Sequence, residues 1–255
     1  MLNAFTRNKT KMMKPKALVA AGAALLWSAL AWADPGYYLV TVYEDAGKAH
    51  VDYRYWTVKR PGSPETVWPE IGIGYGVNTR WYTELYMSYV GPSISHATPS
   101  TLNWQNDFLL TQGQWDVDVA LHTNLIRSQE SSGGDAVEFG PVLQTDVGRV
   151  QLNGNLIFEK SLASGNTTAP QLKYQWQAKY RFQQSLHVGL QGFGELGTWN
   201  NWLGADRQSH RWGPVISGGW AVTDKQRVEY QAAYLTGSVY GGTADMLSLR
   251  LQYVF

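Results

Sequence analysis

Histidines and the polar residues beside them are the side chains of this sequence that could carry out acid–base catalysis. His122 lies near Asp118 and Asn124, and His187 lies near Ser185. Hydrolysis of an ester needs a serine, a histidine and an orienting asparagine or aspartate held close together. Neither group belongs to a recognisable motif, and polar clusters of this kind are more often structural than catalytic. We therefore assign no catalytic residue from the sequence.

Metal binding is not indicated either. The chain has five histidines and no cysteine. Three of the histidines are scattered along it, at His50, His96 and His210. No pair has the spacing of metal ligands, and a chain without cysteine can form neither a thiolate site nor a disulfide. The sequence predicts no metal and no cofactor.

Charged side chains recur at every second position of several segments. Between Leu172 and Phe182 the even positions are apolar or aromatic, and the odd positions hold lysine, arginine or glutamine. Because successive side chains of a strand point to opposite faces, this period predicts a strand with one apolar and one polar face. If the apolar face meets lipid, the polar face lines the lumen of a barrel. The candidate lumen-lining residues are Asp52, Arg54, Glu84, Asp116, Asp118, Glu138, Lys173, Lys179, Arg181, Glu195 and Arg250. Five glycines are expected on the same face, where they mark close packing or leave a little room: Gly72, Gly74, Gly76, Gly140 and Gly189.

The same alternation predicts the elements that position these residues. Twelve strands are expected, at 49–59, 66–77, 80–90, 102–112, 115–126, 137–147, 149–160, 171–182, 185–196, 210–222, 226–237 and 244–255. Tight turns, such as Gly113-Gln114 and Gln183-Gln184, alternate with long polar loops, such as 91–101 and 197–209. Outer-membrane barrels have short periplasmic turns and longer outer loops, a sorting that a soluble sandwich has no reason to adopt. The predicted fold class is therefore all-β, a transmembrane antiparallel up-and-down barrel.

One segment does not fit this scheme. Residues 37–43 are also strand-like and would make a thirteenth strand. An even number of strands is the rule for bacterial outer-membrane barrels. We interpret the segment as a periplasmic or lumen-facing part of an N-terminal lead-in.

The N-terminus has the organisation of a secretory signal peptide. Five basic residues and no acidic residue precede Asp34, and an apolar run at 17–30 leads to the cleavage site Ala31-Trp32-Ala33. The run is shorter than a membrane-spanning helix, which needs about 20 residues. The predicted organisation is a signal peptide at 1–33, a lead-in segment at 34–48 and the barrel at 49–255.

Charge and hydropathy narrow the class of protein further. Removal of residues 1–33 leaves 16 lysines and arginines against 20 acids, a net charge of −4. This balance offers no basic patch for nucleic acid. The mature sequence has no run of 18 apolar residues, which excludes a helical membrane protein, whereas barrel strands leave only a weak hydropathy trace.

The C-terminus alternates strictly and ends on an aromatic residue. Leu249, Leu251, Tyr253 and Phe255 share one face of the last predicted strand. This end resembles the sorting signal of bacterial outer-membrane β-barrels, which the barrel-assembly machinery reads. The resemblance implies an outer-membrane location, with membrane lipid and the assembly machinery as partners.

A second resemblance concerns the body of the chain. Its motifs are Trp68-Pro-Glu-Ile-Gly-Ile-Gly-Tyr-Gly-Val77, then Thr79-Arg-Trp81 and Glu84-Leu85, with similar patterns at 138–144, 177–182 and 189–195. They resemble an uncharacterised proteobacterial outer-membrane β-barrel family, related to the channel group assigned to the MetA pathway of phenol degradation. The resemblance covers most of residues 66–255. It is specific for a fold and carries little information on a substrate.

The sequence thus predicts a Gram-negative outer-membrane barrel that acts as a porin-like channel or passive transporter for a small solute. Hydrophobic and aromatic compounds are candidate solutes. Eight-stranded barrels are filled by their own side chains and sixteen-stranded barrels hold an aqueous channel, so twelve strands leave a closed structural barrel as an alternative. A lipid-modifying enzyme of the outer membrane is the other alternative.

Overall fold

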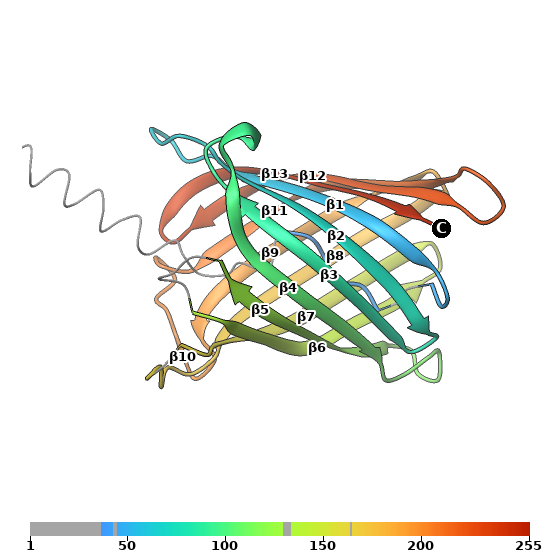
Figure 1. Ribbon diagram of the computed structural model, residues 1–255, viewed down its shortest axis with the longest axis horizontal. Helices are drawn as coiled ribbons and strands as arrows, with labels where there is room; N and C mark the ends of the chain where they lie inside the picture. Colours follow the sequence, from blue (N-terminus) through green and yellow to red (C-terminus); the bar gives the residue numbers. More distant parts are fainter. Residues whose placement is uncertain (1–36, 43–44, 130–133, 164) are drawn as a thin grey trace, which may run out of the picture. The chain divides into compact units, whose positions relative to one another are not determined.

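Twelve long antiparallel strands form a closed ring in the computed structural model, which describes residues 37–42, 45–129, 134–163 and 165–255 (Figure 1). The wall strands are β1 (Ala49–Val58), β2 (Thr66–Asn78), β3 (Trp81–Val90), β4 (Thr98–Leu109), β5 (Asp118–Ser128), β6 (Ala136–Val147), β7 (Val150–Ser161), β8 (Gln171–Gln183), β9 (Leu186–Thr198), β11 (Ser209–Ala221), β12 (Arg227–Val239) and β13 (Gly242–Val254). Each pairs with its neighbour in sequence, and β1 pairs with β13, so the barrel has no free edge.

Two short elements lie outside the wall. The 3₁₀ helix η1 (Ile94–His96) belongs to the connection between β3 and β4, and β10 (Asn201–Trp202) is a two-residue extension paired with β9. No helix in the described ranges has the length and apolar character needed to cross a membrane.

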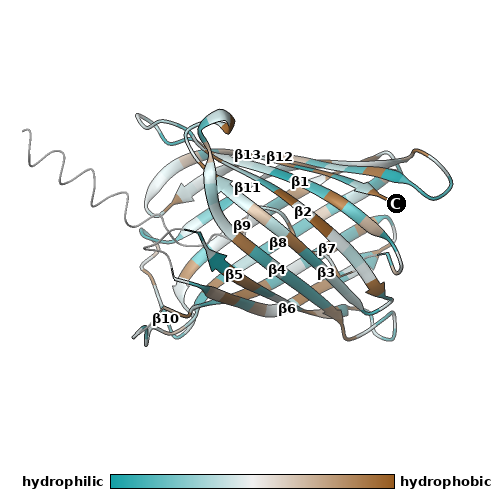
Figure 2. Cartoon of the chain, in the orientation of Figure 1, coloured by the Kyte–Doolittle hydropathy of each residue, from teal (hydrophilic) through white to brown (hydrophobic). Residues whose placement is uncertain are grey.

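The predicted fold class is confirmed, and each of the twelve predicted strands overlaps one wall strand. The residues predicted for the signal peptide, 1–33, lie outside the described residues. Side-chain alternation also agrees with the prediction. On β2 the side chains of Ile71, Ile73 and Tyr75 are 46–67% exposed on the outside of the barrel, whereas Gly72 and Gly74 are buried inside. Hydrophobic and hydrophilic bands accordingly alternate along the strands in Figure 2.

Both chain ends of the barrel lie at the same end, because the strand number is even. We call this the terminal end; it carries the start of β1, the end of β13 and the two-residue connections 79–80, 148–149 and 184–185. The opposite, loop end carries longer connections, such as 91–97 and 199–208. The outward face of β13 presents Leu249, Leu251 and Tyr253, with Phe255 directly after the strand. Their role as an assembly signal stays a prediction.

Two connections contradict the predicted sorting by length. At the terminal end, the expected tight turn Gly113-Gln114 is the eight-residue connection 110–117. Asp118 explains it: one of its carboxylate oxygens accepts hydrogen bonds from the Gly113 amide (2.6 Å) and the Thr111 hydroxyl (3.2 Å), which replace strand pairing there. At the loop end, β12 and β13 are joined by only Tyr240-Gly241, whose φ angles of 47° and 82° are those of a tight hairpin turn.

Apolar side chains also occupy the inside of the barrel. Two buried clusters form there, the first from Tyr37, Trp56, Val58, Phe193, Val215, Ala233, Leu235, Val239, Ala244 and Met246, and the second from Tyr38, Val40, Val42, Leu109, Ala120 and Val142. Both clusters contain residues that precede the first wall strand. The interior is therefore organised around the N-terminal part of the chain.

Candidate functional site

Residues 37–42, here the lumen segment, lie inside the barrel. Tyr37, Tyr38, Leu39, Val40 and Val42 are only 3–5% exposed. Their contacts come from opposite parts of the wall, β9 and β13 at one end of the segment and β4 at the other. The structure thus places the strand-like residues 37–42 in the lumen, the second of the two positions expected from the sequence.

The main chain of the lumen segment bonds to side chains of the wall. The Val40 amide donates to Oε1 of Gln175 (3.1 Å), and Nδ2 of Asn155 donates to the Val40 carbonyl oxygen (2.9 Å). Asn155 also donates to Gln175 (2.8 Å), and the Ser248 hydroxyl donates to the Tyr37 carbonyl oxygen (2.5 Å). Buried main-chain groups need such partners. Since these partners are side chains, none of these bonds belongs to the strand pairing of the wall.

Tyr37 is enclosed by one ion pair and two aromatic rings. The Arg211 guanidinium lies 4.0 Å from the centre of the Tyr37 ring, and the rings of Trp56 and Phe193 meet it edge-on at 4.6 and 5.5 Å. Its hydroxyl donates to Glu195 (3.0 Å), whose carboxylate also binds Arg211 at 2.5 Å. A cation over a ring and edge-on aromatic pairs both stabilise this position.

Tyr38 is enclosed by a larger charged network. The Arg54 guanidinium lies 3.8 Å from the centre of its ring, and the hydroxyl donates to Gln105 (3.0 Å). Arg54 in turn pairs with Asp52 at 2.9 Å, with Glu84, and more distantly with Glu70 at 4.0 Å. All four of these charged residues are at most 3% exposed.

This network contains more carboxylates than guanidiniums. Arg250 adds a second cation, 2.7 Å from Asp52, so two guanidiniums face three carboxylates. Within the described ranges, one oxygen each of Asp52, Glu70 and Glu84 is buried without a hydrogen-bond partner. Burial of carboxylates costs free energy that only their counter-charges offset. Arg54, which touches all three acids, is therefore the residue on which this part of the lumen depends.

A second buried network lies nearer the loop end. Nζ of Lys173 is 2.5 Å from Glu159 and 3.5 Å from Glu138, and Glu138 accepts a further hydrogen bond from Asn124 (3.2 Å). Here too one cation is shared between two acids. The lumen is packed with hydrogen-bonded side chains at these positions.

Most predicted lumen-lining residues are where the alternation placed them. Seven point into the lumen: Asp52, Arg54, Glu84, Glu138, Lys173, Glu195 and Arg250. Lys179, Arg181 and Asp118 are partly exposed toward the terminal end, where Arg181 pairs with Asp146 at 3.2 Å. Asp116 was assigned wrongly: it lies in the connection 110–117, outside any strand, and is exposed.

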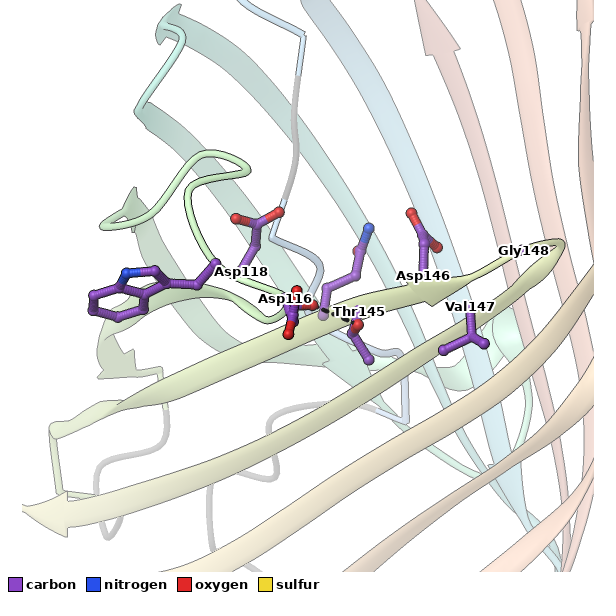
Figure 3. A pocket seen from close by; sticks show the side chains of 8 residues that line it. Asp116, Asp118, Thr145, Asp146, Val147 and Gly148 are labelled. Atoms are coloured by element: carbon purple, nitrogen blue, oxygen red, sulfur yellow. Dashed lines mark hydrogen bonds between the residues drawn. The ribbon is translucent and has the colours of Figure 1, made fainter.

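An open pocket of about 670 Å³ lies beside this connection at the terminal end (Figure 3). It is lined by Trp115, Asp116, Asp118, Gln144, Thr145, Asp146, Val147 and Gly148. The Thr145 hydroxyl donates to the Asp116 carbonyl oxygen (2.6 Å) and holds the connection against β6. Asp118 already accepts a hydrogen bond from the Gly113 amide, and Asp146 already pairs with Arg181. We therefore interpret the pocket as part of the rim of the barrel.

The inward glycines are filled positions and leave no free room. A Cβ atom at Gly74 would overlap the side chains of His50 and Tyr82, and one at Gly76 would overlap the Asp45 carbonyl. At Gly140 it would overlap the main chain of β7. The glycines allow close packing against neighbouring side chains and against the chain that leads from the lumen segment into β1.

His122 is paired differently from the sequence expectation. Its Nδ1 lies 2.6 Å from Asp107, a residue on the neighbouring strand β4 that the sequence did not single out. In the part of the chain that the structure describes, no serine or threonine hydroxyl is hydrogen-bonded to His122. The arrangement supplies an ion pair or hydrogen bond inside the wall and lacks a nucleophile.

Sequence reasoning missed the residues that hold the lumen segment. Tyr37 and Tyr38 lie in a segment without a wall strand, and Gln105, Asn155 and Gln175 are uncharged. Arg211 was overlooked although it alternates with Trp212 and His210 as the other inward residues do. That alternation was the one available signal for it.

Comparison with known proteins supports the fold. No family model matches the sequence, and no curated protein matches it. The NanC porin in a rhombohedral crystal form is 12% identical, with a TM-score of 0.55 over 80% of this chain and 98% of that chain. The COG4313 outer membrane channel from Pseudomonas putida F1 is 14% identical, with a TM-score of 0.56 over 88% of this chain and 100% of that chain. At such identities the likeness shows a shared fold, that of outer-membrane barrels.

Proposed function

We propose that the protein is a channel of the bacterial outer membrane for a small solute, and that the lumen segment closes it until displaced. The observation that carries this proposal is the way the segment is held. The main chain of Val40 and Tyr37 is bonded to wall side chains, and the twelve-stranded ring closes through β1 and β13 without the segment. A purely structural barrel would not require a lumen segment that is separate from the strands of the wall.

Location and orientation belong to the same proposal. The outward faces of the strands are apolar, as lipid requires. With the terminal end in the periplasm, the longer connections of the loop end lie outside the cell. Both solved neighbours are described as a porin or an outer membrane channel, and a relation to the channel group of the MetA pathway is part of the proposal.

Hydrophobic or aromatic solutes fit the lumen best. The lumen segment places two aromatic rings over two buried guanidiniums, at 4.0 Å for Tyr37 and 3.8 Å for Tyr38. Two apolar clusters surround the same rings. When the segment leaves, these ring-binding faces become available to a solute. A purely hydrophilic solute would gain little from them.

The enzyme alternative has less support. Ester hydrolysis needs a nucleophile beside the histidine. The Asp107–His122 pair is buried in the wall and has no hydroxyl partner among the described residues. We infer that the protein is not an enzyme.

Conductance in planar bilayers tests the proposal. Refolded wild-type protein is compared with a variant lacking residues 37–42, which include two tyrosines. The control is the double substitution Tyr75→Ala and Tyr234→Ala, which removes two tyrosine side chains from the outer face of the barrel. The deletion is expected to raise conductance and solute uptake strongly, and the control to match the wild type. A folded deletion variant that passes neither ions nor solutes would establish the closed structural barrel instead.

A further inference from the structure

Glu195 joins the lumen segment to the turn between β12 and β13 at the loop end. One carboxylate oxygen accepts from the Tyr37 hydroxyl (3.0 Å) and from Arg211 (2.5 Å), and the other accepts from the Tyr240 hydroxyl. Tyr37 belongs to the lumen segment, whereas Tyr240 belongs to the two-residue turn between β12 and β13. A single carboxylate thus binds both a buried and a surface tyrosine.

Tyr240 has an unusual backbone for its residue type. Among the described residues, Tyr240 is the one non-glycine residue with a positive φ, which is 47°. Its side chain lies at the loop end and the residue is 51% exposed. Glycine or asparagine suits this position of a tight hairpin turn. A tyrosine kept in this strained conformation suggests that its side chain has a specific function, and the side chain forms a hydrogen bond to Glu195. Its amide also donates to the buried Ser209 hydroxyl (3.1 Å), which fixes the direction of the turn.

Among the described residues, Tyr38 has no comparable link to the surface. Its hydrogen-bond partners Gln105 and Tyr86 are both 3% exposed. Of the two tyrosines of the lumen segment, Tyr37 is therefore the one whose contacts a molecule bound at the loop end can affect.

We propose that Tyr240 is an outer latch of the lumen segment. Its hydroxyl keeps Glu195 turned toward Arg211 and Tyr37, and a solute that displaces the Tyr240 side chain at the loop end thereby loosens Tyr37. The solute that does this carries a hydrogen-bond donor, which binds the Glu195 carboxylate in place of Tyr240 and draws it toward the loop end, away from Arg211 and Tyr37. Binding at the loop end and release of the segment are coupled, since both disfavour the state in which Glu195 holds two tyrosines. This inference rests on the proposed channel function.

Cysteine labelling measures the release directly. The chain has no cysteine, so Leu39→Cys introduces one reactive thiol in the middle of the lumen segment, at a position that is 3% exposed. Its labelling rate by a small thiol reagent in the refolded barrel reports how often the segment leaves. Tyr240→Phe, which removes only the hydroxyl, is expected to raise this rate about tenfold, because a hydrogen bond to a charged group stabilises by at least that factor. Tyr234→Phe, on the lipid face of the adjoining strand β12, is the matched control and is expected to leave the labelling rate unchanged.

A double-mutant cycle separates the latch from general loosening. Tyr37→Phe and Tyr240→Phe act through the same carboxylate, so their effects on labelling are expected to be non-additive. The Tyr38 hydroxyl donates to Gln105 and the Tyr240 hydroxyl to Glu195, so the effects of Tyr38→Phe and Tyr240→Phe are expected to be additive. An unchanged labelling rate in Tyr240→Phe, or additivity in the first cycle, overturns the latch. Coupled labelling in a protein that never conducts supports the latch and refutes the channel.

Discussion

Tyr37 and Tyr38 are neighbours in sequence and have the same chemistry, yet the barrel holds them in two different ways. Each ring lies over a guanidinium and each hydroxyl donates to a buried acceptor. Around Tyr38 the acceptor is neutral and the guanidinium is shared by three carboxylates. Around Tyr37 the acceptor is the carboxylate that also pairs with the guanidinium, and apolar side chains surround the ring.

This difference indicates that the Tyr38 site contributes mainly to the stability of the barrel, and the Tyr37 site to the control of the lumen segment. The Tyr38 site is part of a network without which the wall itself would carry unpaired buried charge. The Tyr37 site is built on one ion pair, Arg211–Glu195, and reaches the loop end through Tyr240. A segment held at both sites is firmly seated at one and adjustable at the other. The following substitutions test this division.

Removal of the two arginines is expected to have the largest effect. Arg54→Met leaves Asp52, Glu70 and Glu84 with Arg250 as their nearby cation and is expected to destabilise the barrel by about 3–5 kcal/mol. Arg211→Met affects a single carboxylate, Glu195, which keeps two tyrosine hydroxyls and the charge of Lys173, so it is expected to cost less, about 1–3 kcal/mol. Urea unfolding in lipid vesicles measures both. Equal losses would remove the distinction between the two sites.

Removal of the rings is expected to act on the lumen segment and to spare the wall. Tyr37→Ala and Tyr38→Ala each remove a desolvated cation–π contact of about 2 kcal/mol, which corresponds to roughly a 30-fold rise in the population without the segment. Strand pairing is untouched, so the unfolding midpoint is expected to stay near that of the wild type. Single-channel recordings give the open probability, with Tyr75→Ala as control. A large loss of barrel stability without a change in open probability would mean that the segment is a permanent part of the core.

Removal of the hydroxyls alone is expected to have the smallest effect and to rank the sites in the opposite order. Tyr37→Phe loses a hydrogen bond to a carboxylate, and Tyr38→Phe loses one to a neutral amide, a difference of about 1 kcal/mol. The labelling rate of a cysteine at position 39 measures both variants on one scale. If Tyr38→Phe releases the segment more readily than Tyr37→Phe, the adjustable site has been misplaced.

The sequence by itself determined the wall of the barrel. Alternation is a local property of a strand, so residues such as Lys173 and Glu138 could be assigned to the inner face from their own neighbours in the chain. Errors arose where side chains replace strand pairing. At 110–117 the carboxylate of Asp118 accepts from the Gly113 amide and the Thr111 hydroxyl, in a connection that places Asp116 outside the wall, and no alternation pattern reports such bonds.

Only the tertiary structure decided what fills the lumen. Residues 37–42 are strand-like, rich in β-branched and aromatic residues, and their sequence cannot tell whether they pair in the sheet or lie inside it. Closure of the ring by β1 and β13 leaves them no edge to join, and it brings Gln175, Asn155 and Arg54 from distant parts of the chain around them. The choice between open and occupied lumen is therefore made by contacts between residues far apart in sequence, which a local pattern does not contain.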